Sequence, residues 1–213
     1  MASCKCMFGI VLFSAVAMSG VVLAQPSMLP PNITTCEQFE RGARFNPYAV
    51  VDAMWKIFYF WSNTTEVYPI IFSLAAKKRV QKFRDVFEAV SPGEEIEWHK
   101  ATLVMEPRPG IEVMFLYAGT PGAFRAIIKH ERRTKERPHP LPLIKFADVR
   151  MKLVSRFMGM MCCEDLTAFA LVRVDEVPKT EELCVLAAST IGYQGYPGRS
   201  YISIMNTEKE KEL

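Results

Sequence analysis

Six cysteines and three histidines are the residues of this chain with the widest range of chemistry. Zinc sites use such residues at short, regular spacings, commonly as Cys-x-x-Cys pairs. The chain has no Cys-x-x-Cys pair, and His99, His130 and His139 do not stand at ligand spacing. No Ser-His-Asp pattern and no paired carboxylates stand out as a catalytic constellation. We therefore predict no metal site, no cofactor and no enzymatic activity.

The cysteines are better explained as disulfide partners. Cys4 and Cys6 lie in an N-terminal segment that we expect to be removed, so an even number remains for pairing in an oxidising compartment. If the adjacent Cys162 and Cys163 lie on a strand, they point to opposite faces and have different partners. We expect one of them to join Cys36 and to hold the N-terminal segment against the body. The predicted disulfide cysteines are Cys36, Cys162, Cys163 and Cys184.

The N-terminal segment has the order of a secretory signal peptide. The cation Lys5 precedes an apolar run over residues 8–24, and Val22 and Ala24 suit the positions that a signal peptidase reads. We predict a signal peptide over residues 1–24 and a secreted, extracellular protein that keeps no stable membrane span. A retained membrane anchor is the alternative, because the run is near the lower length limit for crossing a bilayer. Two serines and a glycine interrupt the run and favour the signal peptide.

Two sequons for N-glycosylation, at Asn32 and Asn63, agree with secretion. Retention in the endoplasmic reticulum is the alternative destination, because the chain ends in Glu-Leu as retention signals do. The preceding Glu210 and Lys211 do not match those signals, so we interpret the C-terminal end as a solvated tail.

Composition narrows the class of protein. Half of the residues are hydrophobic, and they include 14 Phe and 12 Met, so the chain can bury a core and is not disordered. The net charge of +3 gives no reason to expect a nucleic-acid partner. The basic run over residues 130–137 is interleaved with acids, and we interpret it as a solvated loop.

The middle of the chain indicates short strands separated by turn signals. Residues 79–90 are ambiguous, because Val80, Phe83 and Phe87 fit a helical stripe while the surrounding pattern favours a strand. Eight or nine strands at this spacing are typical of an all-β barrel or sandwich. The remaining predicted strands are residues 51–61, 67–75, 94–105, 111–117, 124–129, 151–161, 166–174 and 183–188.

Three segments resemble the lipocalins, and among them the arthropod type. Phe-Asn-Pro-Tyr at residues 45–48, followed by Met54-Trp55-Lys56, is similar to the start of the family's first strand. Residues 163–172 resemble the family's turn between two late strands, with Asp165, Phe169 and Ala170 in register. Residues 182–189 resemble the last strand of the barrel. Ala53 replaces the family's Gly, and the Arg that usually closes the last strand is missing at Ser189 and Thr190.

The resemblance implies an all-β fold, an eight-stranded antiparallel up-and-down barrel with at most a short C-terminal helix. The barrel would occupy residues 45–191, after an N-terminal segment over 25–44 and before a tail over 192–213. Such a barrel is just wide enough to hold one small ligand.

Strand alternation predicts which residues line that barrel. If Trp55 plugs the closed end, then Ile57, Tyr59 and Trp61 follow it along the inner face. On another strand Val113, Phe115 and Tyr117 share a face with Ile111, opposite Glu112 and Met114. We assign structural roles to Trp55 and Asp165. The predicted ligand contacts are Ile57, Tyr59, Trp61, Val113, Phe115, Tyr117 and Phe169.

Three functions follow from these expectations. The first is a secreted carrier of a small hydrophobic molecule, since the resemblance implies cargo such as pigments, lipids or odorants. The second is an interaction protein that holds no ligand and binds a protein partner through loops such as residues 137–143. The third is an enzyme that uses a cysteine thiolate, although no cation or histidine near the cysteines is evident to activate one.

Overall fold

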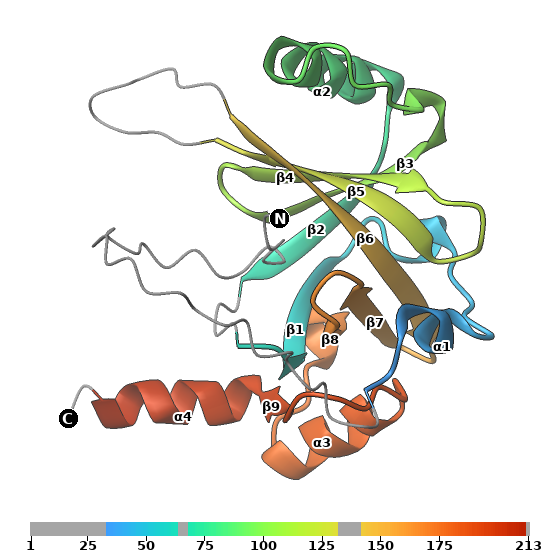
Figure 1. Cartoon of the computed structure of the whole chain (residues 1–213). Helices are drawn as coiled ribbons and strands as arrows, with labels where there is room; N and C mark the ends of the chain where they lie inside the picture. The colour runs from blue at the N-terminus through green and yellow to red at the C-terminus, as the bar shows by residue number, and fades with distance from the viewer. Residues whose placement is uncertain (1–32, 64–67, 132–141, 212–213) are drawn as a thin grey trace, which may run out of the picture.

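The computed structural model describes residues 33–63, 68–131 and 142–211 (Figure 1). The predicted signal peptide, the Asn32 sequon and most of the basic loop that starts at His130 therefore lie outside the described residues. In the described ranges, no helix has the length and apolarity needed to cross a bilayer.

Eight strands form a closed antiparallel barrel in which each strand pairs with its neighbours in the chain. The first strand closes the circle by pairing with both the second and the eighth. This confirms the predicted eight-stranded up-and-down barrel. The strands are β1 (Met54–Trp61), β2 (Pro69–Leu74), β3 (Ala101–Arg108), β4 (Ile111–Tyr117), β5 (Ala123–His130), β6 (Leu143–Val154), β7 (Phe157–Cys162) and β8 (Thr167–Arg173).

The seam between β1 and β2 is short. Only Met54, Trp55 and Lys56 of β1 pair with β2, and a ninth strand, β9 (Arg199–Ser200), pairs with β1 further along. Helix α4 (Tyr201–Lys211) follows β9 directly, and its Ile204 is buried in the cluster that fills the barrel. The end of the chain, predicted as a tail, thus includes a strand and a helix, because Ile204 has an apolar site to occupy.

Helix α2 (Lys77–Val90) lies against the outer face of β3, β4 and β5 (Figure 1). The preference for a strand over residues 79–90 was therefore wrong. Phe83 and Phe87 form a helical stripe that packs on outward residues of the barrel, among them Val104 and Met114. The polar residues between these apolar positions lie on the solvent side of the helix. This arrangement is that of an amphipathic helix and explains why the segment does not fit the period of a strand.

Helix α3 (Glu181–Ser189) occupies the segment that we predicted as the last barrel strand. That prediction was also wrong, because β8 completes the barrel and leaves no position for residues 183–188. The Thr180 side chain caps the helix by accepting a hydrogen bond from the Leu183 amide. One face of α3, including Cys184, Ala187 and Ala188, packs on the outer side of β1, β7 and β8.

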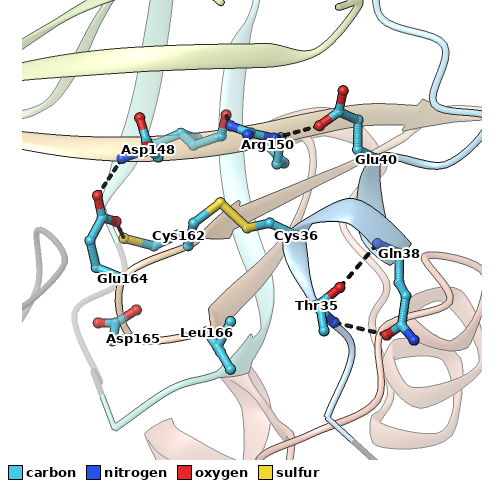
Figure 2. The surroundings of a disulfide bond; sticks show 12 residues. Thr35, Cys36, Gln38, Glu40, Asp148, Arg150, Cys162, Glu164, Asp165 and Leu166 are labelled. Atoms are coloured by element: carbon cyan, nitrogen blue, oxygen red, sulfur yellow. Dashed lines mark hydrogen bonds and ion pairs between the residues drawn. A yellow bond between two sulfur atoms is a disulfide. The ribbon is translucent and has the colours of Figure 1, made fainter.

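Helix α1 (Cys36–Glu40) is fixed to the barrel by the bonds that Figure 2 shows. A disulfide joins Cys36 to Cys163, and the Arg150 Nε atom donates to Glu40 Oε2 at 2.6 Å. This confirms that Cys36 clamps the N-terminal segment through one of the adjacent cysteines. Three short 3-10 helices complete the described elements: η1 (Pro47–Ala49), η2 (Trp98–Lys100) and η3 (Val174–Glu176).

The two ends of the barrel differ. At the closed end, Phe45 packs edge-on against Phe124 at 5.5 Å between ring centroids, and Trp55 Nε1 donates to the Val50 carbonyl at 2.8 Å. The segment before β1 therefore covers this end. At the opposite end, which we call the loop end, β3 turns into β4 at Pro109–Gly110 and β7 turns into β8.

Candidate functional site

The inner face of the barrel is an apolar surface built from all eight strands. Aromatic side chains of neighbouring strands pack together on it, as in the Phe115–Phe124 and Phe60–Phe169 ring pairs, whose centroids lie 5.7 Å and 6.2 Å apart. Four methionines contribute flexible, polarisable side chains that can repack around a guest. They are Met105, Met151, Met158 and Met160.

Four of the seven predicted contacts face this interior. Ile57, Val113, Phe115 and Phe169 belong to the buried inner cluster, as does Ile111. Their inward placement is confirmed, whereas their contact with a ligand stays a prediction. Alternation identified Val113 and Phe115 because β4 has one face inside the barrel and the other face, with Glu112 and Met114, outside it.

Tyr59 and Trp61 do not face the interior, and their prediction as inner residues was wrong. A β-bulge lies between Ile57 and Tyr59, where two residues of β1 pass against one residue of β8. The bulge shifts the alternation by one residue. Phe58, Tyr59 and Trp61 consequently pack in the outer cluster under α3, and Phe60 takes the inner position.

Tyr117 shares the inner side of β4, because its cross-strand partner Phe124 belongs to the inner cluster, but the barrel does not enclose it. It ends β4 beside the closed end, where it is 40% exposed and its hydroxyl donates to the Gly119 carbonyl at 2.8 Å. The residue lies on the expected strand, but β4 leaves the covered part of the barrel before reaching it.

Trp55 has the structural position that we predicted. It is buried in the inner cluster at the closed end, and its cross-strand partner is Arg173, the last residue of β8. The expected position of a closing Arg, at residues 189–190, follows helix α3 and not a barrel strand. The register of β8 with β1 identifies Arg173 as the residue that ends the last barrel strand opposite Trp55.

Asp165 holds the turn between β7 and β8. Its Oδ1 atom accepts hydrogen bonds from the Thr167 backbone amide at 3.1 Å and from the Thr167 hydroxyl at 2.7 Å. Leu166 next to it adopts φ 55°, a left-handed conformation that a non-glycine residue holds only when its surroundings fix it. The structural role predicted for Asp165 is confirmed.

The cysteines divide between the two faces of the barrel. Cys162 belongs to the inner cluster, while Cys163 packs with the outer cluster and bonds Cys36, so the predicted opposite orientation is confirmed. Cys184 was predicted in a disulfide, but it is a free thiol on the buried side of α3. Burial, with the charge of Glu181 nearby, raises the pKa of the Cys184 thiol to about 11. A thiol with that pKa is a poor nucleophile at neutral pH.

The outer wall under α2 carries a network of charges. Glu112 Oε1 accepts from Arg79 Nε at 2.8 Å, and Glu112 Oε2 lies 2.6 Å from Lys129 Nζ. Burial acts to raise the pKa of Glu112, but the hydrogen bonds from Lys129 and Arg79 outweigh it and hold the pKa below its ordinary value. A surface groove of about 550 Å³ runs past this network, between α2 and the Pro109–Gly110 turn. The network anchors α2, and no signal in the sequence pointed to it.

A second carboxylate behaves in the opposite way. Glu164, beside the β7–β8 turn, accepts a hydrogen bond from the Asp148 amide at 2.5 Å, as Figure 2 shows. Its pKa is raised, first by burial and also by the charges of Asp148 and Asp165. Within the described ranges, no group of three or more His, Cys, Asp or Glu side chains is placed to hold a metal ion.

Fold and interior together define a closed eight-stranded antiparallel barrel with an apolar inner face and covered outer walls. Comparison of the chain with protein-family models, with curated proteins and with solved structures finds no match.

Proposed function

We propose that the protein is a secreted carrier that binds a small hydrophobic ligand in the loop-end half of its barrel. The observation that carries the proposal is the closed barrel whose buried inner cluster is apolar. Small-molecule sites are concave and mainly apolar, with few polar groups. The lipocalin resemblance of the sequence points to the same class of function.

The loop end is the better half for a ligand. Inner side chains in the middle of the barrel, such as Val113 and Met158, are completely buried, whereas Ile128 near the loop end keeps 6% of its surface exposed. Two small inner residues, Ala126 and Ala147, lie directly opposite each other on β5 and β6. These small side chains add little bulk to the interior beside Phe115, the partner of Ala126 on β4.

Secretion belongs to the same proposal. The predicted signal peptide, the Cys36–Cys163 disulfide and the exposed sequon residue Asn63 support it. Mass spectrometry of the protein recovered from the culture medium of expressing cells is expected to report an N-terminus at Gln25 and a glycan on Asn63. Protein held inside the cell with residues 1–24 attached would contradict secretion.

The binding proposal is tested by filling the loop-end half. Ile128→Phe is expected to weaken binding of the neutral probe N-phenyl-1-naphthylamine about tenfold, because the ring displaces roughly two methylene groups of ligand, each worth about 0.8 kcal/mol. Fluorescence titration of the secreted protein measures the affinity. Ile71→Phe is the matched control, since Ile71 lies on the outer face of β2 with 49% of its surface exposed.

The outcomes separate the site from the function. Absence of saturable probe binding by the wild-type protein would refute the carrier. Equal weakening of probe binding by Ile128→Phe and Ile71→Phe would show that the ligand does not bind in the loop-end half. Thermal unfolding of both variants establishes that they are folded.

Contact with a protein partner is the second candidate function. The observation that favours it is the outer face of α3, where Leu183, Val185 and Leu186 are 50%, 47% and 66% exposed. This face differs from the loop at residues 137–143 that the sequence suggested. Size-exclusion chromatography with light scattering, comparing wild type with Leu186→Ser, is expected to show a change of association state if this face is used.

A further inference from the structure

Lys145 lies on the inner side of the barrel wall. It is the cross-strand partner of Ile128, which belongs to the inner cluster, and directly opposed residues of an antiparallel pair share a face. Its neighbours Ile144 and Phe146 pack outward against the cluster under α2. Lys145 is therefore a half-buried cation on a wall that is otherwise apolar at its level.

Three partly buried cations on or against the outer side of the barrel wall have carboxylate partners, and Lys56 and Lys152 lie over the rings of Tyr201 and Phe39 instead. Arg79 and Lys129 bind Glu112, and Arg150 binds Glu40. Lys145 makes no ion pair with any residue in the described ranges. A half-buried charge without a counter-charge is unfavourable, because it loses water without gaining a partner.

The position of Lys145 suits the entrance of the interior. Residues 143–147 of β6 pair with β5 beyond the point where β7 ends its pairing at Val149, so this part of the β5–β6 hairpin projects past the β7–β8 turn. His130 stands one inner-face position further out, diagonal to Lys145, at the distance of about 7–8 Å typical of such neighbours. Below them, Ile128 and Ala126 lead into the apolar interior.

We propose that Lys145, with His130 beside it, binds the anionic head group of an amphiphile whose apolar tail lies in the barrel. The inference rests on the proposed carrier function and specifies its ligand class. A carboxylate at this place supplies the counter-charge that Lys145 lacks, in a charge-assisted hydrogen bond. The apolar rows below accept the tail, and the head group stays at the loop end near water.

The test compares two ligands of equal chain length, dodecanoate and dodecanol, by isothermal titration calorimetry at pH 7.5 with the secreted protein. The wild type is expected to bind dodecanoate about tenfold or more tighter than dodecanol, as hydrogen bonds to charged groups are among the stronger ones. Lys145→Met keeps the apolar stem and removes the charge. It is expected to lose this preference while binding dodecanol as the wild type does. Lys82→Met, on the exposed side of α2, is the control and is expected to keep the preference.

Dodecanol binding reports the carrier function without the head group. If dodecanol binds but the wild type shows no preference for dodecanoate, or Lys145→Met retains the preference, the head-group site is refuted and the carrier stands. If neither ligand binds, the carrier function itself fails, and this inference with it. Retained dodecanol binding by Lys145→Met also shows that the variant is folded.

Discussion

Replacement of Cys36 by serine is expected to lower the free energy of unfolding by about 4–5 kcal/mol. The Cys36–Cys163 bond joins residues 127 positions apart, and a cross-link that closes so long a loop removes much conformational entropy from the unfolded chain. The bond also ties α1 to the barrel, where Glu40 and Arg150 add an ion pair. Chemical denaturation of the secreted protein measures the change.

Two controls make this expectation specific. The double variant Cys36→Ser with Cys163→Ser should be no less stable than Cys36→Ser alone, since both remove the same cross-link. Cys184→Ala, which changes a buried free thiol, should cost only about 1 kcal/mol. A Cys36→Ser protein that unfolds at the wild-type denaturant concentration would show that the bond contributes nothing.

Replacement of Glu112 by glutamine is expected to cost roughly 2–4 kcal/mol at neutral pH. Removing one partner of a buried ion pair leaves the other charge uncompensated. Here that charge is Lys129, which is only 9% exposed and keeps only the longer, more exposed contact with Glu131 at 3.8 Å. Arg79 loses a partner as well, and with it α2 loses its polar anchor to β4. The 18% exposure of the Glu112 side chain keeps the expected cost below that of a fully buried pair.

A matched control lies in the same network. Glu106 also pairs with Arg79, but its side chain is 54% exposed. Exposed ion pairs contribute little because water and salt screen them, so Glu106→Gln should cost less than about 1 kcal/mol. Equal losses for Glu106→Gln and Glu112→Gln would contradict the assigned importance of burial.

The effect of Glu112 should depend on pH in a defined direction. The pKa of Glu112 is lowered in the folded protein, so its contribution is complete above the pKa of the unfolded chain and is lost as the pH falls through the lower, folded pKa. The stability difference between wild type and Glu112→Gln should therefore be constant near neutrality and shrink below about pH 4. A difference that grows on acidification would refute the assignment.

Local patterns in the sequence predicted much of the barrel. Short apolar runs between turn signals located most of the barrel strands, and the inner face of β4 follows from simple alternation. The predicted strand over residues 151–161 was wrong in its bounds, because it joins the end of β6 to β7 across their turn. The count of eight strands and their up-and-down order were implied by the family resemblance. The link from Cys36 to one of two adjacent cysteines followed from the opposite faces of a strand. Asp165 was recognised through the resemblance of residues 163–172 to the family's turn, and in the structure it accepts hydrogen bonds from Thr167 within that turn.

The errors occurred where a distant part of the chain determines the local structure. Residues 183–188 look like a strand, but β8 already closes the barrel and α3 covers its outer wall instead. Tyr59 and Trp61 face outward because of a bulge that exists only in the pairing of β1 with β8. Cys184 has no disulfide because it lies on the buried side of α3, away from the bond between Cys36 and Cys163.

The sequence by itself thus determined the signal-peptide pattern, the all-β class and the opposite orientation of Cys162 and Cys163, because each depends on residues close together in the chain. Only the tertiary structure decided which aromatic residues of β1 line the interior, that Arg173 is opposite Trp55, and that Lys145 faces the interior without a carboxylate partner in the described ranges. Those features depend on strand register, and register is set by pairing between segments that are distant in the sequence.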